Sequence, residues 1–391
     1  MVSVSSALSS INQQVAVLKS VFIPLERALG YVLAEDIFAP ISLPPFRQSA
    51  MDGYALRHGD LMDYELVGEC KAGDFKEYDL IENQAVRIFT GARVPDQADT
   101  VIIQENIKKE GSRIQIQQVP KPFSNVRPMG EQVKEGELIA KKGAKINPAF
   151  IGFLAGFGLE EVLVISKPKI ALILTGNELQ GPGNPLKPGA VYETNGITMM
   201  NILAENDFSV ESLVHVPDEE KAIEEAILNA LAYDLVLISG GISVGEYDFV
   251  KAGLDSNGVE EKFYKINQKP AKPIFFGKKS DSLVFALPGN PASLFTCMLV
   301  YVIPAIRKMV SGKALELNFK KGILNGQIEN RFNKSLFLLA TEEDGIIEIL
   351  AQQACSMLIS FAHSNALVYV DESIERIEFG GQVRYIPINR N

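Results

Sequence analysis

The sequence predicts a multidomain protein in which a parallel-sheet α/β domain is combined with β-rich segments. With 391 residues the chain exceeds what one hydrophobic core usually serves, so we expect two to four domains. Apolar strands and amphipathic helices alternate between residues 169 and 310, which is typical of βαβ units. Residues 46–141 and 311–391 instead contain short strands separated by Gly, Asp and Pro, which is typical of β domains.

The N-terminal region, residues 1–45, is predicted to be helical before a Pro-rich exit. Its apolar residues follow the spacing of an amphipathic helix: Leu25, Ala28, Leu29, Val32 and Leu33. A second small helix is expected at Pro148–Gly158, and we expect it to pack against the first. Residues 1–45 and 142–168 then form a helical segmented domain, and residues 46–141 form a β domain inserted between its two parts.

Short strands are expected within the inserted β domain. They are Tyr64–Val67, Ala85–Phe89, Thr100–Gln104 and Ile114–Val119. The last two flank the turn-forming residues 108–112, which predicts a hairpin between them. Two further turns carry polar side chains. Asp52 lies in the dense turn Pro44–Ala55, where Asp52-Gly53 is also compatible with a plain hairpin, and Thr90 lies in the Gly turn Phe89–Ala92.

The α/β domain, residues 169–310, is predicted from its regular alternation. We expect strands and helices at Lys169–Leu174, Thr194–Asp207, Phe208–Val216, Glu219–Ala232, Asp234–Ser239 and Leu283–Leu287, with a further helix from Pro291. Ligands of such sheets bind beyond the carboxyl ends of the strands. The turns Thr175–Glu178, Gly240–Asp248 and Pro288–Ser293 all fall there.

Residues 311–391 are predicted to form a second β domain. Its expected strands are Leu336–Ala340, Ile346–Leu350, Ala366–Val370 and Gln382–Ile386.

Composition excludes several classes of protein. A net charge of −10 argues against a large nucleic-acid or anionic-membrane surface. The three cysteines and three histidines are scattered, so neither a disulfide framework nor a zinc centre is expected. The N-terminus lacks the basic start of a secretory signal, and Pro288–Pro291 interrupts the most apolar window, so we expect a soluble, cytoplasmic protein without a membrane span.

The α/β domain also carries residues suited to phosphate and Mg²⁺. The stiff turn Pro288, Gly289, Asn290 and Pro291 directs backbone N–H groups before a helix, a geometry suited to anions. Six lysines lie in the acid-free run 262–279, and the rigid segment Lys269–Pro273 holds Lys269 and Lys272; a solvated basic face is the alternative. Glu178, Asp218 and Asp248 lie near strand ends and suggest Mg²⁺ ligands, although Asp218 would also serve as a helix cap.

Six segments together resemble the molybdenum-insertion enzymes, that is, the bacterial MoeA proteins and the E domain of gephyrin. They are Pro45–Ala55, Phe89–Pro95, Thr175–Leu179, Gly240–Asp248, Lys269–Pro273 and Leu287–Ser293, and the resemblance runs from about Pro24 to the C-terminus. It implies four domains, the last a C-terminal β-barrel, in an elongated homodimer whose cleft lies between the α/β domain of one subunit and the β domain of the other. It also implies hydrolysis of adenylylated molybdopterin with Mg²⁺ and molybdate, which releases AMP and molybdenum cofactor.

The resemblance assigns roles to individual residues. Asp52, Thr90, Glu178 and Asp248 are implied to be catalytic, and Glu178, Asp218 and Asp248 to bind the metal. The implied substrate-binding set is Arg127, Ser243, Lys265, Lys269, Lys272, Pro288, Gly289, Asn290 and Pro291. The implied partners are adenylylated molybdopterin, molybdate, a second copy of the chain and the molybdopterin adenylyltransferase. The motifs favour neither molybdate nor tungstate, since the two oxyanions have nearly the same size.

The sequence departs from the family pattern in four places. Asn177 replaces an acid, Gln132 replaces another, Ala271 replaces a glycine, and Gln353-Ala354-Cys355 stands for Gln-Gly-Ser. These changes bear on metal affinity, ligand fit and turnover. A non-catalytic molybdopterin-binding or scaffold protein is therefore an alternative, and adenylyl transfer is a third, although that enzyme resembles residues 169–310 alone.

Overall fold

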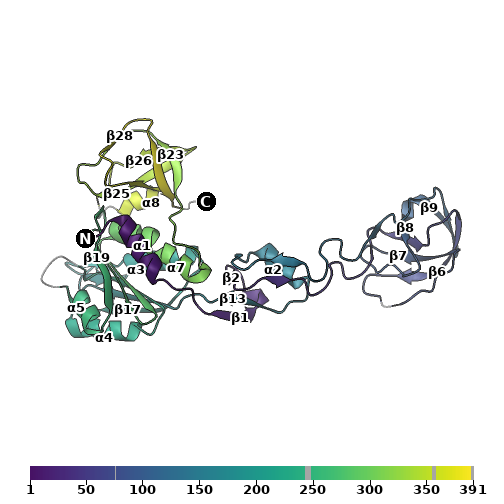
Figure 1. The fold of residues 1–391 in the computed structure, drawn as a ribbon, viewed down its shortest axis with the longest axis horizontal. Helices are drawn as coiled ribbons and strands as arrows, with labels where there is room; N and C mark the ends of the chain where they lie inside the picture. The colour runs from purple at the N-terminus through teal and green to yellow at the C-terminus, as the bar shows by residue number, and fades with distance from the viewer. Residues whose placement is uncertain (75, 243–247, 355–357, 389–391) are drawn as a thin grey trace. The chain divides into compact units, whose positions relative to one another are not determined.

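The structure, a computed structural model, describes residues 1–74, 76–242, 248–354 and 358–388. The chain divides into two compact units (Figure 1). The α/β–barrel unit comprises Met1–Val21 and Ile165–Asn391, and the intervening unit comprises Phe22–Val164. Residues 1–21 therefore belong to the α/β–barrel unit, whereas the sequence pattern grouped residues 1–45 with residues 142–168.

Helix α1 (Val4–Gln14) accounts for this difference. Ser3 caps the helix, since its Oγ accepts a hydrogen bond from the Ser6 backbone N–H at 3.1 Å. The apolar side of α1 buries Val4, Ala7 and Ile11 in the same core as the strands of the α/β sheet. Periodicity shows that a helix has one buried side, but it does not show which domain covers that side.

A six-stranded sheet forms the centre of the α/β–barrel unit, in the order β17-β14-β18-β22-β21-β19. The first four strands are parallel, as the sequence predicts, and the last two are antiparallel to their neighbours. The strands are β14 (Ile170–Thr175), β17 (Val210–Val216), β18 (Leu235–Ser239), β19 (Glu260–Lys265), β21 (Pro273–Lys279) and β22 (Ser282–Leu287). The predicted parallel-sheet α/β domain is therefore confirmed.

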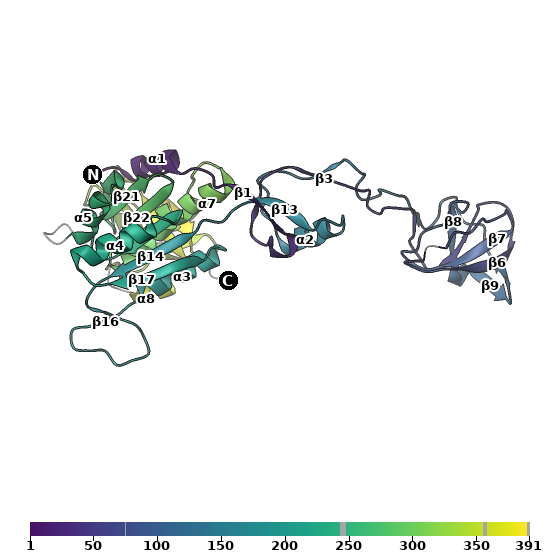
Figure 2. The ribbon, with the colours of Figure 1, turned by 90° about the horizontal axis from the view of Figure 1, so that it is seen from below.

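Helices cover both faces of this sheet (Figure 2). Leu172 and Leu174 of β14 lie in one core, and Ala171 and Ile173 lie in the other. This alternation follows from the two-residue period of a strand and explains why the central strands β14, β18 and β22 are almost entirely apolar. The helices are α3 (Asn195–Glu205), α4 (Glu220–Ala230), α5 (Phe249–Ser256), α6 (Pro291–Cys297), the π-helical turn η3 (Met298–Val302) and α7 (Ile303–Ser311).

The last three of these helical segments form one continuous apolar helix, Pro291–Ser311. By length and composition this helix could cross a membrane, but 72% of its apolar window is buried inside the protein. It begins at Pro291, where the missing N–H costs no helical hydrogen bond, and it ends at Gly312, which has a φ of 68°. These features are those of a core helix.

The C-terminal residues form a closed β-barrel, which confirms that part of the predicted fold. Strand β25 pairs with both β26 and β27, and β23 and β29 complete the ring. The elements here are β20 (Gln268–Lys269), β23 (Lys320–Leu324), β24 (Ile328–Glu329), β25 (Ser335–Glu343), β26 (Ile346–Ile349), α8 (Leu358–His363), β27 (Ala366–Val370), β28 (Arg376–Ile377) and β29 (Gln382–Pro387). Strand β20 joins the edge of the barrel through β25.

The predicted amphipathic helix over Leu25–Leu33 is wrong. In the intervening unit this segment belongs to a small hydrophobic core built from short strands and one helix. Only a short 3-10 turn, η1 (Leu25–Arg27), forms there, and β2 (Val32–Leu33) follows it. The amides of Gly30 and Leu33 donate to the carbonyls of Ile146 and Ala144 rather than to the preceding turn. Leu29 is 52% exposed, so the apolar spacing here reflects a compact turn and not a helix. The other elements of this core are β1 (Ser20–Pro24), β3 (Ile37–Phe38), β12 (Leu138–Ala140), α2 (Pro148–Ala155) and β13 (Glu161–Ile165).

Residues 46–141 contain a six-stranded sheet in the order β8-β5-β7-β6-β10-β9. Its elements, with one small accessory pair and a 3-10 turn, are β4 (Gln48–Ser49), β5 (Gly53–Leu56), β6 (Asp63–Cys70), β7 (Gln84–Ile88), β8 (Thr100–Ile103), η2 (Gln104–Asn106), β9 (Ile107–Glu110), β10 (Arg113–Ile116) and β11 (Val126–Arg127). The predicted pairing of Thr100–Gln104 with Ile114–Val119 is wrong. The hairpin joins β9 to β10, because η2 redirects the chain and leaves β8 paired with β5.

Candidate functional site

Three turns meet at the carboxyl edge of the α/β sheet. Leu174 is paired with Ser239, and Ser239 with Leu287, so the turns that follow β14, β18 and β22 begin at the same level. Such an edge is where ligands bind in α/β proteins. The predicted residues Pro288, Gly289, Asn290 and Pro291 lie here, with Pro288 buried and Gly289 and Asn290 exposed. Ser243 lies outside the described residues.

Gly240 is the point of closest approach between these turns. Its φ is +95°, and a Cβ there would lie 2.3 Å from the carbonyl oxygen of Thr175. On another side, a Cβ added to Gly289 would lie 3.4 Å from the Gly240 Cα. The Gly240 N–H donates to the Leu287 carbonyl at 3.3 Å. Only glycine fits this position, because both the backbone conformation and the space exclude a side chain.

Asp218 is held against the first turn. Its Oδ1 accepts a hydrogen bond from the Thr175 hydroxyl, and its backbone N–H donates to the Asn177 Oδ1 at 3.2 Å. The alternative role as a helix cap does not occur, because Glu219 precedes α4 and no side chain caps it. Asn177 stands where the resemblance implies an acid, and its amide oxygen accepts the hydrogen bond from the backbone N–H of Asp218.

Asp248 caps a helix and also accepts a hydrogen bond from a half-buried tyrosine. Its Oδ1 caps α5 by accepting the Lys251 N–H at 3.0 Å, and its Oδ2 accepts the Tyr264 hydroxyl. Burial, together with the hydrogen bond to Asp248, raises the pKa of Tyr264, so the phenol remains a donor at neutral pH. One carboxylate thus links the start of α5 to β19.

The three predicted metal ligands do not form one cluster. Glu178 is exposed at the base of the loop between β15 (Leu179–Gln180) and β16 (Val191–Tyr192), which extends away from the sheet (Figure 2). Among the residues that the structure describes, no group of three or more His, Cys, Asp or Glu side chains is placed to hold a metal ion. Asp218 and Asp248 remain the carboxylates with defined partners at this edge.

The predicted lysines lie near the junction with the barrel. The Lys269 ammonium lies 4.0 Å from the ring centroid of Phe332, which attracts it by a cation–π interaction. Both residues line a cavity of about 230 Å³ between the Lys269–Pro270 segment and the barrel. Lys265 lies 5.1 Å from the Tyr264 ring centroid, and Lys272 is exposed.

The methyl group of Ala271 lies in the apolar core and not at a surface that a ligand could approach. The added methyl was expected where backbone approaches a ligand, but Ala271 is 4% exposed and belongs to the apolar core. It adopts a φ of 65°, a conformation that favours glycine, so the substitution strains the loop from its core side.

The remaining predicted residues belong to the intervening unit. Asp52 precedes β5, and its Oδ1 accepts hydrogen bonds from both the N–H and the hydroxyl of Thr90, each at 2.8 Å. The two bonds from Thr90 lower the pKa of Asp52, with a smaller contribution from Arg87. Arg127 lies in β11, paired with Gln48, and its side chain is exposed. The structure therefore brings together an exposed carboxylate, Asp52, and the neutral donor Thr90.

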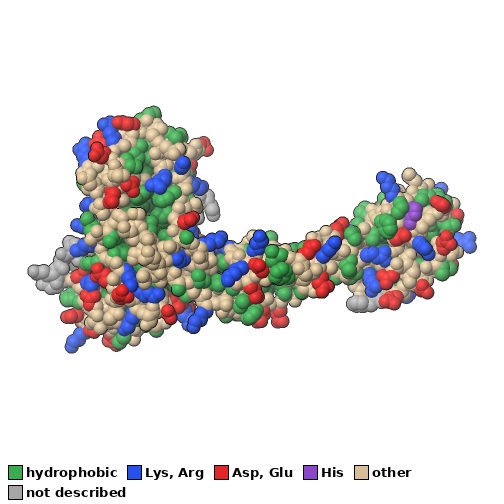
Figure 3. Space-filling view, in the orientation of Figure 1, with side chains coloured by type: hydrophobic (Ala, Val, Ile, Leu, Met, Phe, Trp, Pro, Cys, Tyr) green, Lys and Arg blue, Asp and Glu red, His purple; other side chains and the backbone are tan. Residues whose placement is uncertain are grey.

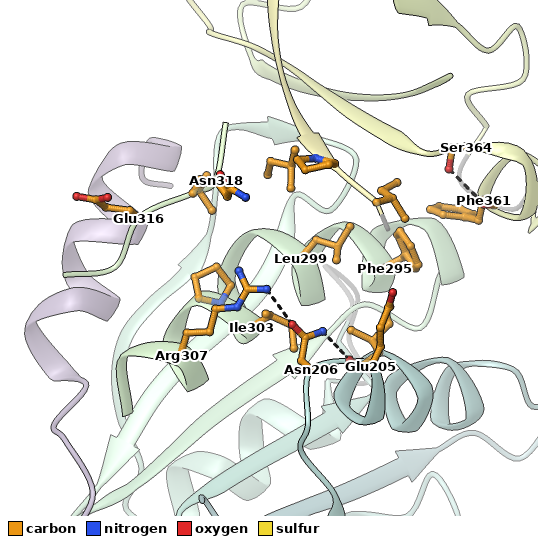
Figure 4. A pocket seen from close by; sticks show the side chains of 16 residues that line it. Glu205, Asn206, Phe295, Leu299, Ile303, Arg307, Glu316, Asn318, Phe361 and Ser364 are labelled. Atoms are coloured by element: carbon orange, nitrogen blue, oxygen red, sulfur yellow. Dashed lines mark hydrogen bonds between the residues drawn. The ribbon is translucent and has the colours of Figure 1, made fainter. Parts of the chain in front are cut away.

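A separate pocket of about 290 Å³ contains none of the predicted residues (Figure 4). It lies between α3, α6, α7 and the barrel, where Arg307 donates to Asn206 at 2.9 Å beside Phe295, Leu299 and Phe361.

The surface charge is mixed on the face that Figure 3 shows. Basic and acidic side chains are interspersed there, and no broad basic surface is present on that face.

Sequence reasoning missed three residues at the carboxyl edge and the barrel junction. They are Asn195, Tyr264 and Phe332, which contact Gly289, Asp248 and Lys269 respectively. None lies within the motifs that suggested the site. For Asn195, the one available indication was its place at the start of a predicted helix beyond a parallel strand.

Comparisons with known proteins agree with this architecture. Residues 2–158 match the family described as MoeA N-terminal region (domain I and II), and residues 171–308 match the probable molybdopterin binding domain. A molybdopterin molybdenumtransferase of Haemophilus influenzae is 34% identical over 385 residues, covering 94% of each chain. One of Staphylococcus epidermidis is 30% identical over 404 residues, covering 100% of this chain and 96% of its own. The crystal structure of a molybdopterin biosynthesis MoeA protein from Pyrococcus horikoshii matches with a TM-score of 0.85 and 27% identity, covering 100% of both chains.

We predict that Gly240→Ala destabilises the α/β–barrel unit by about 2–4 kcal/mol, because the methyl combines a left-handed φ with overpacking. Urea unfolding followed by circular dichroism measures the change. Gly181→Ala is the matched control, since a Cβ at Gly181 meets nothing within 4 Å. Equal stability of the two variants would contradict the close approach at Gly240.

We predict that Thr90→Val raises the pKa of Asp52 toward its ordinary value of 3.8, because the hydroxyl bond is lost while the backbone bond remains. The lowered pKa favours the folded state above this pH, and the stabilisation is lost as the pH falls through the folded pKa. Carbon-detected NMR titration of the carboxyl group gives the value. Asp371, whose pKa is lowered by Ser373, should not change in the same sample, and an unchanged Asp52 would refute the pairing.

Proposed function

Because this chain belongs to the MoeA family of molybdopterin molybdenumtransferases, we propose that it inserts molybdenum into molybdopterin in molybdenum cofactor biosynthesis. The observation that carries the proposal is the meeting of three turns at the carboxyl edge of its α/β sheet. Two oriented carboxylates, Asp218 and Asp248, accompany these turns, and the lysines of the barrel junction lie nearby.

The proposed substrate is adenylylated molybdopterin, with AMP released as molybdenum is inserted. Phosphate groups suit a turn that leads into a helix N-terminus, as Pro288–Pro291 leads into α6. The chain as a whole carries a net charge of −10, so the anion must be held by local donors. Lys265, Lys269 and Lys272 supply positive charge on the side of the barrel junction.

We propose Mg²⁺ as the metal, with Asp218 and Asp248 as its protein ligands. It takes oxygen ligands, usually one or two carboxylates together with substrate phosphates and water. Asp218 and Asp248 are carboxylates whose oxygens each keep a free lone pair after bonding Thr175, Lys251 and Tyr264. Bound there with a phosphate, the ion would offset negative charge at the phosphoanhydride. Molybdate is a substrate and not a resident group.

The chain's own residues act mainly by electrostatics in this proposal. Hydrolysis of the phosphoanhydride places negative charge on the departing AMP, and N–H groups fixed before the reaction stabilise that charge without reorganising. Tyr264 keeps Asp248 in one orientation, and Thr175 does the same for Asp218. Asp52, which accepts two hydrogen bonds from Thr90, offers a third carboxylate for contact with the substrate.

Assembly as a cytoplasmic homodimer is part of the proposal. Asp52 and Thr90 belong to the intervening unit, while Asp218 and Asp248 belong to the α/β–barrel unit. A cleft formed by two subunits would allow both sets to act on one substrate. The reaction that supplies this substrate must be an adenylyl transfer to molybdopterin, so an adenylyltransferase is the proposed partner.

We predict that Asp248→Asn abolishes Mg²⁺-dependent AMP release and leaves binding of adenylylated molybdopterin within about tenfold, or roughly 1.4 kcal/mol. Asparagine still caps a helix, so α5 keeps its start while the site loses one charge. A ligand for the metal matters most as charge moves onto the leaving phosphate, which affects turnover more than binding. Single-turnover release of AMP and equilibrium binding measure the two effects.

Tyr264→Phe is the matched control, since it removes the hydrogen bond to Asp248 but keeps the carboxylate. It should slow AMP release less than Asp248→Asn does. A wild-type protein that binds the substrate yet releases no AMP at millimolar Mg²⁺ and molybdate would refute the enzyme and favour the binding or scaffold protein.

A further inference from the structure

Asn195, the first residue of α3, joins two of the turns at the carboxyl edge. Its Nδ2 donates to the Ser239 Oγ at 2.9 Å and to the Gly289 carbonyl oxygen at 2.8 Å. Ser239 ends β18 immediately before Gly240, and Gly289 lies within the turn Pro288–Asn290 that follows β22. One side-chain amide thus connects three segments that are distant in sequence.

The orientation of this amide is determined by its partners. A carbonyl oxygen only accepts hydrogen bonds, so the nitrogen of Asn195 must face Gly289 and its oxygen must point elsewhere. The Asn195 Oδ1 is buried and has no hydrogen-bond partner among the residues that the structure describes. A buried acceptor without a donor costs stability, so the place of this amide calls for an explanation other than folding stability.

Glu193 fixes the backbone on which Asn195 stands. It is 5% exposed, and its Oε1 accepts the Gly196 N–H at 2.7 Å at the start of α3. A carboxylate there is favourable because it interacts with the positive end of the helix dipole. The start of α3 therefore holds the backbone of Asn195 in place, independently of the turns that its side chain contacts.

We propose that Asn195 is a positioning residue for the reaction, holding the Ser239–Gly241 turn and the Pro288–Asn290 turn at the separation that receives a substrate phosphate. The inference rests on the proposed function in one respect, namely that the bound phosphate belongs to the substrate. It gives Asn195 no contact with the reacting atoms. Its contribution is to the spacing of the turns, which in turn sets how tightly a phosphate is bound.

Stability and binding separate this role from a structural one. Removal of the Asn195 side chain loses two hydrogen bonds but also removes the unpartnered oxygen, so these effects on folding oppose each other. Ligand binding has no such compensation. Asn195→Ala should therefore weaken binding much more than it changes the unfolding midpoint, whereas a merely structural residue would show the reverse.

The test uses AMP as the probe, with the purified full-length protein and isothermal titration calorimetry. We expect Asn195→Ala to raise the Kd for AMP about tenfold and Ser239→Ala about threefold, because the bond to Gly289 survives in the second variant. The double variant should bind no worse than Asn195→Ala, since the shared bond is already lost. Asn201→Ala, which removes an exposed α3 side chain bonded only to the Ile197 carbonyl at 2.8 Å, is the control.

Measurements of AMP binding and of molybdenum insertion distinguish a failure of the positioning role from a failure of the proposed function. A Kd for AMP that Asn195→Ala leaves unchanged, or additive effects in the double variant, would overturn the positioning role. Wild-type protein that does not bind AMP at millimolar concentration would also overturn it, since no phosphate would then be held at these turns. AMP binding that responds as expected, without any molybdenum insertion, would support the positioning role and reject the proposed enzyme.

Discussion

The close approach between Gly240, the Thr175 carbonyl oxygen and Gly289 is the constraint on which the candidate site depends. It brings the ends of three parallel strands so near to one another that only glycine fits between them. Side chains then secure the arrangement from outside. Asn195 spans from Ser239 to Gly289, and Thr175 holds Asp218. The arrangement of these three turns is therefore a consequence of backbone packing at the edge of the sheet.

Two carboxylates of the α/β–barrel unit lie near the three turns at the carboxyl edge of the sheet. The chain is acidic overall, yet lysines lie near the barrel junction, and the carboxylates of Asp218 and Asp248 accept hydrogen bonds from neutral donors. The hydroxyls of Thr175 and Tyr264 leave the charge on Asp218 and Asp248 intact, whereas an ion pair with lysine would neutralise it. Carboxylates that keep their negative charge are the ligands that a divalent cation prefers.

The sequence predicts the α/β sheet and the main strands of the C-terminal β domain well because these strands are apolar and regularly spaced, whereas their closure into a barrel was implied by the family resemblance. It fails over Leu25–Leu33, where helical spacing occurs without a helix and the amides bond to residues 144–146. It also misplaces α1, because a buried helix face does not identify its partner. For the site, motifs located the turns and Asp218, but they did not indicate Asn195 or the ring of Phe332 over Lys269. Those contacts depend on tertiary packing between segments far apart in the chain.

A crystal structure of the protein soaked with AMP tests the central claim most directly. We expect the phosphate to lie against the turns at Gly240–Gly241 and Pro288–Asn290, within hydrogen-bond distance of their backbone N–H groups. A phosphate bound in the pocket beside Arg307, or at any site away from these turns, would contradict the account.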